Sequence, residues 1–405
     1  MHPRALTVAF ALGYFTFYLC RVGLSVVRPV WLTELISDGT SETTALRMIG
    51  NIVSCGMLAA AVCKLTVGHW IDRSKPVKPF VISGLLVIIT TVAIAIGGYT
   101  SWFIGSIAHR GAQTLGWPTL TKWVTTSESV TNRNRILGYC SMSWILGDAL
   151  ARLSHGGLLQ YGISWRWNFV VAATVVLVSL IGIVLTSQKV TARVDFIDEI
   201  AEHHADESYA APWQSSPFWG ALGLSVALSL SREAVMEWMP TYLVTSKLLQ
   251  VGAASMVSAI IPIGAAIGTL YLGKAYYRVP GVRRPKSFST FVVFAGVLFL
   301  LIPATRHSLP MMIACLSAIG ITLGGAYATL LGEIASSIGG KSRVATSTSI
   351  IDGIGSIGGI LAGRGIAELV STLGWSVVWS ALGALCLLSG IGWIVTDKDD
   401  RQVVA

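Results

Sequence analysis

Long apolar blocks, each of roughly 20 residues or more, recur along the chain and constrain its fold more than any other feature. A helix of that length crosses about 30 Å of hydrocarbon. Lipid offers no partner for an open strand edge, so such blocks cross the membrane as helices. The 405 residues are 53% hydrophobic and 12% charged, and their mean hydropathy is +0.67. The sequence therefore predicts an all-α membrane protein with many spans.

Twelve candidate transmembrane spans can be counted, six on each side of one long polar stretch. They cover residues 5–33, 45–69, 78–98, 102–123, 135–160, 167–187, 217–246, 253–276, 287–304, 309–332, 344–370 and 374–396. The first apolar block contains Arg21 and lacks a small-x-small cleavage site, so we expect it to be retained as a span. We expect a six-helix N-terminal half at 1–187, a cytoplasmic linker at 188–216 and a six-helix C-terminal half at 217–405.

The basic residues indicate how the spans are oriented. Lysine and arginine gather in alternate loops, near residues 73–78, 122–135, 189–193, 274–286, 341–343 and 398–401. Cytoplasmic loops carry such an excess, so we expect both termini and the linker to face the cytoplasm, in a plasma membrane of the bacterial inner-membrane kind. The net charge of +9 is then explained by the basic residues of the cytoplasmic loops, and no nucleic-acid partner is expected.

A short pattern containing an arginine occurs once in each half of the chain. Arg21 is followed eight residues later by Pro29, and Arg232 is followed eight residues later by Pro240. An aromatic residue and a leucine complete the pattern R-x7-P-x-[WY]-L in both places, 211 residues apart. These stretches are the first and seventh candidate spans. Internal repeats of this kind are typical of transporters whose substrate binds between the halves, near the bilayer midplane.

Arg21 lies deep in its span, and its helix face is polar. An arginine at the centre of a span costs about 2.5–3.5 kcal/mol on insertion scales. Spacings of four and three place it on one face with Tyr14, Tyr18, Ser25 and Arg28. Two arginines at equivalent positions favour a water-filled cavity that binds an anion, since guanidinium matches phosphate or carboxylate bidentately. A structural ion pair remains the alternative.

The loop after the second span resembles a motif of the major facilitator superfamily. The stretch GHWIDRSKP has the G-x-x-x-D-R core at Gly68, Asp72 and Arg73, and the layout of six plus six spans is similar as well. The resemblance implies that Asp72 caps a neighbouring helix end and that Arg73 pairs across a cytoplasmic gate.

More narrowly, the chain is similar to the organophosphate:phosphate antiporters of that superfamily. YFTFYLCR resembles the family's first span, CKLTVGHWIDRSKP its second-span ending, QTLGWP its fourth span and SREAVMEWMPTYL its seventh. The resemblance implies that Arg21 and Arg232 bind the phosphoryl group of the substrate. The resemblance, together with positions that depart from the family, predicts a substrate site and a gating or charge network. The site comprises Arg21, Arg232, Lys64, Tyr14, Tyr18, Trp117, Trp144 and Asp148; the network comprises Asp72, Arg73, Arg152, Glu233 and Glu237.

Several positions depart from the family pattern. Val22 follows Arg21 where the family commonly has lysine, and Trp144 stands about where the exchangers have a histidine. Asp148 and Arg152 are spaced to pair on one helix face. This pair is either structural or contributes to substrate selection. Glu233 is an added acid directly after Arg232. The membrane-embedded Asp352 and Arg364 match no motif and receive no role.

We expect a secondary transporter that exchanges an organophosphate, such as a sugar phosphate or glycerol phosphate, for inorganic phosphate. An empty site would hold two repelling guanidiniums, which gives obligatory exchange a physical reason. A membrane sensor of sugar phosphates with the same fold and a proton-coupled organic-anion symporter are the alternatives. The sequence shows no nucleophile–base pair, no cofactor-binding loop and no cluster of metal ligands, so we expect neither an enzyme nor a cofactor. His203–His204 lie in the charged linker, where we interpret them as solvated residues rather than metal ligands. We expect a monomer whose partners are the lipid bilayer and a small anion.

Overall fold

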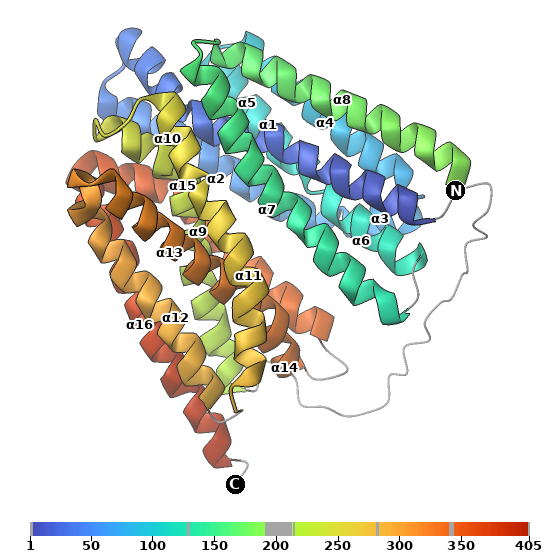
Figure 1. Cartoon of the computed structure of the whole chain (residues 1–405), viewed down its shortest axis with the longest axis vertical. Helices are drawn as coiled ribbons and strands as arrows, with labels where there is room; N and C mark the ends of the chain where they lie inside the picture. Colours follow the sequence, from blue (N-terminus) through green and yellow to red (C-terminus); the bar gives the residue numbers. More distant parts are fainter. Residues whose placement is uncertain are drawn as a thin grey trace. The chain divides into compact units, whose positions relative to one another are not determined.

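The computed structural model describes residues 3–127, 130–190, 213, 215–280, 283–339 and 344–403, and every regular element among them is a helix. The expected spans appear in order (Figure 1). They are α1 (Pro3–Ser37), α2 (Glu42–Thr66), α4 (Val77–Ile96), α5 (Tyr99–Gln113) with α6 (Gly116–Ser127), α7 (Val130–Gln160), α8 (Trp165–Val190), α9 (Ser216–Thr245), α10 (Val251–Ser258) with α11 (Ile260–Arg278), α12 (Arg284–Leu301) with η3 (Ile302–His307), α13 (Leu309–Thr329) with η4 (Leu330–Ile334), α15 (Val344–Leu373) and α16 (Trp375–Val403). Two short helices, α3 (Gly68–Arg73) and α14 (Ala335–Gly339), follow the second and tenth spans. The all-α fold class is confirmed.

Nine helical segments within the described residues are long and apolar enough to cross a membrane. The α5–α6 pair, α7 and α9 are not among them, and α7 and α9 are the helices that carry Asp148, Arg152, Arg232 and Glu233. Many large apolar side chains point outward, such as Ile89, Val178 and Leu388, each more than 60% exposed. An outer surface of this kind suits contact with lipid.

Contacts divide the chain into two compact units, and their boundaries differ from those of the expected N-terminal and C-terminal halves. The first unit comprises Met1–Val27 and Cys55–Glu207, and the second comprises Arg28–Ser54 and Ser208–Ala405. The end of α1 and the start of α2 are thus grouped with the C-terminal half. Most of the expected linker, together with the histidine pair at 203–204, lies outside the described residues.

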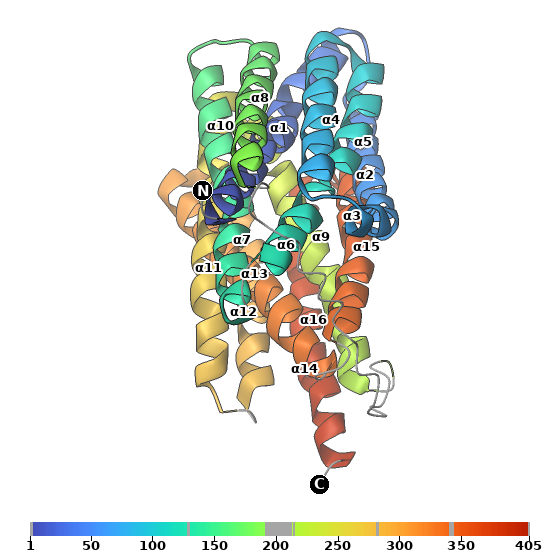
Figure 2. The same ribbon diagram turned by 90° about the vertical axis from the view of Figure 1, so that its right-hand side faces the viewer.

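The first unit is built around aromatic side chains of α1. In this unit α4 packs against α5 (Figure 2) and α8, and α6 packs against α7. The rings of Phe10 and Phe80 lie 4.8 Å apart, and those of Phe17 and Phe80 lie 5.1 Å apart. The indole N–H of Trp123 donates to Thr7 Oγ1 at 3.0 Å, so this buried indole keeps a polar partner.

The second unit depends on helices that approach closely through glycine. Its main packed pairs are α9 with α15, α11 with α13, and α12 with α16 (Figure 1). A Cβ added to Gly268 of α11 would lie 2.0 Å from the carbonyl oxygen of Ile321 in α13. A Cβ added to Gly320 would lie 2.3 Å from the carbonyl oxygen of Ile261. Membrane helices commonly pack through such small residues, because lipid supplies little hydrophobic drive for their association.

We expect Gly268→Ala to destabilise the second unit by about 1–3 kcal/mol, because the added methyl group meets a backbone atom that cannot rotate away. The purified protein in detergent will unfold at a lower temperature. The matched control is Gly223→Ala in α9, where an added Cβ has no atom within 4 Å. Equal unfolding temperatures for the two variants would contradict the close packing of α11 on α13.

Candidate functional site

In the first unit, an arginine and four aromatic residues form a connected group. The Nη1 atom of Arg21 donates to the Tyr18 hydroxyl at 3.3 Å, and its guanidinium carbon lies 5.3 Å from the centre of that ring. Tyr14 contacts both Tyr18 and Trp117, with ring centres 5.5 and 5.7 Å apart, and Tyr18 lies 6.3 Å from Trp144. Five of the residues expected at the substrate site therefore lie together. We call them the Arg21 cluster.

Two glycines allow α6 and α7 to reach this part of α1. A Cβ on Gly147 of α7 would lie 2.7 Å from the carbonyl oxygen of Phe15 and 3.0 Å from Tyr18 Cβ. A Cβ on Gly116 of α6 would lie 2.8 Å from Tyr14 Cδ2. Close helix approach at these glycines brings Trp144 and Trp117 against the tyrosines.

Asp148 and Arg152 form a buried ion pair on α7. Arg152 Nε donates to Asp148 Oδ1 at 2.6 Å, and the two side chains are 1% and 12% exposed. The sequence allowed either a structural pair or a contribution to substrate selection, and this geometry matches the structural pair. A role of Asp148 in substrate selection stays a prediction.

Three other charged residues that the sequence analysis singled out in this unit are exposed and are not among the five residues of the Arg21 cluster. Lys64 is exposed in the last turn of α2, and Asp72 and Arg73 are exposed at the end of α3. The end of α3 is held by Lys122, whose ammonium group donates to the carbonyl oxygens of Ile71, Asp72 and Ser74 at 3.0, 2.6 and 2.8 Å. From the sequence, Lys122 was expected only as one of the basic residues of a cytoplasmic loop.

Two buried residues of α5 were missed from the sequence. His109 is fully buried with Nδ1 3.2 Å from Thr90 Oγ1 and 3.4 Å from Thr91 Oγ1. Arg110 is 4% exposed, and its Nη1 lies 3.5 Å from Met57 Sδ. The first unit therefore buries Arg110 as well as Arg152, and the repeat pattern indicates neither.

In the second unit, Arg232 has a carboxylate on one side and an aromatic ring on another. Its Nη2 atom donates to Glu233 Oε1 at 2.5 Å. Its guanidinium carbon lies 4.5 Å from the centre of the Tyr327 ring. The Tyr327 hydroxyl donates to Asp352 Oδ1 at 3.0 Å. We call these four residues the Arg232 cluster.

Close packing of α9 on α15 supports this arrangement. A Cβ on Gly355 would lie 2.3 Å from Ser225 Oγ, and one on Gly358 would lie 2.3 Å from the carbonyl oxygen of Val226. Asp352 lies one helical turn before Gly355, which explains how an acid on α15 comes into the cluster. The sequence showed Asp352 as an embedded charge without a role, and Tyr327 gave no signal within its apolar run.

Glu237 pairs with Arg28 within the second unit. Arg28 Nη2 donates to Glu237 Oε2 and Nη1 donates to the Glu237 carbonyl oxygen, with side chains 2% and 7% exposed. Arg28 belongs to the polar stripe of α1 but was not expected at the site. Charge balance by Glu237 was expected, and the geometry supplies its partner.

A second set of ion pairs in this unit joins α2 and α15. Arg47 donates to Glu368 through Nε at 3.0 Å and Nη2 at 2.5 Å, and Arg364 Nη2 lies 3.2 Å from Glu368 Oε2. Arg364 Nη1 also donates to Asn51 Oδ1 at 3.3 Å. Arg364, to which the sequence assigned no role, thus has Glu368 and Asn51 as partners.

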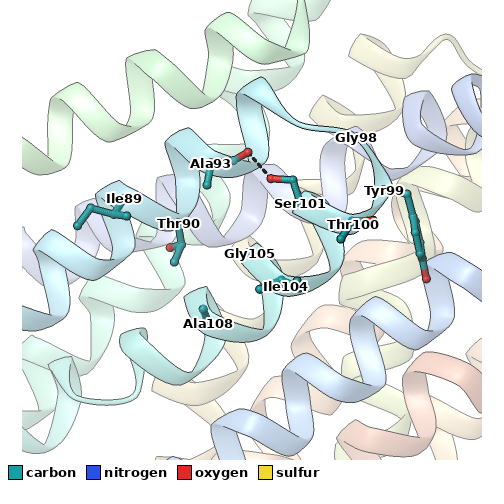
Figure 3. A pocket seen from close by; sticks show the side chains of 10 residues that line it. All are labelled: Ile89, Thr90, Ala93, Gly98, Tyr99, Thr100, Ser101, Ile104, Gly105 and Ala108. Carbon is teal, nitrogen blue, oxygen red and sulfur yellow. Dashed lines mark hydrogen bonds between the residues drawn. The ribbon is translucent and has the colours of Figure 1, made fainter.

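A cavity of about 610 Å³ lies between α4 and α5 in the first unit (Figure 3). Ser101 Oγ donates to the Ala93 carbonyl oxygen at its edge, at 2.6 Å. Its lining residues are Ile89, Thr90, Ala93, Gly98, Tyr99, Thr100, Ser101, Ile104, Gly105 and Ala108. None of these side chains is a lysine or an arginine, so the cavity lacks the groups that would hold a phosphate. Among the described residues, no group of three or more His, Cys, Asp or Glu side chains is placed to bind a metal ion.

Comparison with known proteins identifies the family. Residues 10–363 match the family model of the Major Facilitator Superfamily. The chain belongs to the major facilitator superfamily. This family membership, with transporters among the relatives, makes the protein a multi-pass membrane transporter rather than an enzyme.

Similar curated proteins support the narrower resemblance. A protein from Arabidopsis thaliana named putative glycerol-3-phosphate transporter 2 is 23% identical, over 94% of this chain and 83% of its own length. The glucose-6-phosphate exchanger SLC37A2 of Danio rerio is 23% identical, over 89% of this chain and 80% of its own. The resemblance to the organophosphate antiporters is thereby confirmed.

Solved structures of other transporters share the fold. A bacterial homologue of the human lysosomal transporter Spinster, in an inward-facing and occupied conformation, has a TM-score of 0.77 at 15% identity and covers 97% of this chain and 96% of its own. A D-xylose–proton symporter has a TM-score of 0.77 at 13% identity, with 97% of each chain covered.

Proposed function

We propose that this major facilitator superfamily protein transports organophosphates, such as glycerol phosphate or a sugar phosphate, in exchange for inorganic phosphate. The observation that carries the proposal is an arginine on the face of a tyrosine ring in each unit, Arg21 with Tyr18 and Arg232 with Tyr327. The names of the relatives, glycerol-3-phosphate transporters and glucose-6-phosphate exchangers, support the same substrate class.

Arginine on an aromatic face suits an anion site inside a membrane. The ring stabilises the cation from one side by a cation–π contact, and the planar guanidinium keeps N–H donors at its edge. A phosphoryl group offers several acceptor oxygens to such donors. We propose that Arg21 and Arg232 both bind this group, while Tyr14, Trp117 and Trp144 contact the organic part through hydroxyl and ring surfaces.

The remaining expectations extend this proposal. Alternating access requires that the protein close on its bound anion and reopen on the other side, and Asp72, Arg73 and Glu237 are proposed to act in that cycle. The basic loops support cytoplasmic termini in a plasma membrane. A monomer is sufficient for the cycle, since each of the two units supplies one arginine cluster.

Counterflow in vesicles tests the proposal. Purified protein reconstituted into vesicles that contain inorganic phosphate should take up labelled glycerol 3-phosphate or glucose 6-phosphate. Vesicles that contain chloride instead should take up little. Specific binding of these esters without any counterflow would contradict transport and favour a sensor.

The acids near Arg232 favour one second candidate, proton-coupled anion transport. Glu233 and Asp352 both belong to the Arg232 cluster, and carboxylates in transporters commonly carry the coupling proton. Uptake driven by an imposed pH gradient into phosphate-free vesicles would favour this candidate over exchange.

A further inference from the structure

Glu233 stands where an anionic substrate would bind Arg232. Its carboxylate accepts from Arg232 Nη2 at 2.5 Å, and the two side chains are 8% and 20% exposed. A charge-assisted hydrogen bond of this kind is the interaction by which guanidinium recognises phosphate. Arg232 therefore already has an anion when no substrate is bound.

The pairing is unusual for neighbouring residues of a helix. Side chains at i and i+1 point in directions about 100° apart and do not normally face each other. Here both side chains turn toward a common point beside α9. Because Glu233 is attached to the next backbone position, its carboxylate is present at a high effective concentration near Arg232.

The rest of the Arg232 cluster limits where a competing anion can bind. The Tyr327 ring covers one face of the guanidinium, and the hydrogen bond from its hydroxyl to Asp352 fixes the ring. In-plane N–H groups are the donors that bind oxygen, and Glu233 takes one of them. An incoming phosphate that uses this donor, and the positive charge that Glu233 already balances, competes with Glu233.

We propose that Glu233 is an internal counter-anion that selects the substrate at Arg232. This inference rests on the proposed function, since it concerns the anion that Arg232 binds during transport. A monocarboxylate offers the same group that Glu233 already supplies, and it must also lose its freedom of motion on binding. A phosphoryl dianion offers more charge and more acceptor oxygens, so it displaces Glu233 where a carboxylate does not.

The same competition assists release and changes the expected mechanism of exchange. When the anion leaves, Glu233 returns to Arg232 and neutralises it. Repulsion between two bare guanidiniums, expected from the sequence, is therefore not what governs the empty state. Glu233 lowers the affinity for anions and in return speeds their release.

The test is the affinity of the detergent-purified full-length protein for inorganic phosphate and for lactate, measured by titration of its thermal unfolding temperature. Ligands that bind only the folded state raise that temperature according to their affinity. In Glu233→Gln we expect phosphate to bind about tenfold more tightly and lactate binding to become measurable. In counterflow, the same variant should show a lower KM and a lower kcat. Glu42→Gln, an exposed acid of the same unit, is the matched control and should leave all four quantities unchanged.

Unchanged or weaker phosphate binding by Glu233→Gln, beside a wild type that binds and exchanges phosphate, overturns this inference alone. Failure of both proteins to bind phosphate overturns the inference and the proposed function together. If Glu233→Gln does not fold, Glu233→Asp serves as the second test. The aspartate side chain is one methylene shorter, so its carboxylate binds Arg232 less well. An increase in its phosphate affinity supports the competition, and no increase overturns it.

Discussion

Replacing either cluster arginine by alanine will reduce phosphate counterflow by about 100-fold or more. Each guanidinium is expected to give the phosphoryl group two charge-assisted hydrogen bonds, worth roughly 1.5–3 kcal/mol apiece. Loss of both from Arg21→Ala or Arg232→Ala corresponds to at least two orders of magnitude in affinity. The initial rate of labelled glycerol 3-phosphate uptake into phosphate-loaded vesicles measures the effect.

Lysine substitutions separate charge from geometry. Arg21→Lys and Arg232→Lys keep the positive charge but lose the planar fork of donors, so we expect exchange rates between those of alanine variants and wild type. Arg166→Ala and Arg306→Ala remove exposed arginines, one from each unit, and should leave the rate unchanged. Robust uptake by Arg21→Ala or Arg232→Ala would exclude the proposed site.

The spans and the α1 part of the Arg21 cluster were predictable because both depend on local sequence. Membrane thickness sets the length of an apolar block, so the expected ranges match the helices to within several residues. Helical spacing alone places Tyr14, Tyr18 and Arg21 on one face. The position of Trp117 and Trp144 near them came from the family resemblance, and the close approach at Gly116 and Gly147 supplies its physical basis.

The partners of the charges were not predictable in the same way. Tyr327 and Asp352 lie 95 and more residues beyond Arg232 in the chain, and their contact depends on how α13 and α15 pack on α9. Arg28 has a position on the α1 stripe, but the pattern does not state that its partner is Glu237. Pairing across such separations is decided by tertiary packing, on which a single sequence carries little information.

The grouping of Arg28–Ser54 with the C-terminal half has the same origin. Hydropathy assigns this segment to the first two spans, and the repeat assigns those spans to the N-terminal half. The ion pairs of Arg28 and Arg47 with Glu237 and Glu368, however, join it to α9 and α15. These ion pairs, together with the close approach of Gly50 to Gly363 and Ala367, account for the contacts of the segment with those helices.

Breaking the Arg28–Glu237 pair from one side will destabilise the protein by about 3–5 kcal/mol, because a buried charge is then left without its partner. The side chains are only 2% and 7% exposed, so water cannot take over that role. Arg28→Met and Glu237→Gln should each lower the unfolding temperature of the purified protein. Glu368→Gln is the matched control, since Glu368 and its partner Arg47 are 41% and 36% exposed and solvent screens pairs of this kind, so little change in unfolding temperature is expected.

The double variant Arg28→Met/Glu237→Leu distinguishes a lost ion pair from lost packing. It removes both charges together and keeps apolar volume, so its unfolding temperature should return close to that of the wild type. A double variant less stable than either single variant would show that the pair itself, beyond charge compensation, stabilises the second unit. We propose that contacts at this segment break and re-form during transport, so we expect the double variant to exchange phosphate more slowly than the wild type even when its stability is restored.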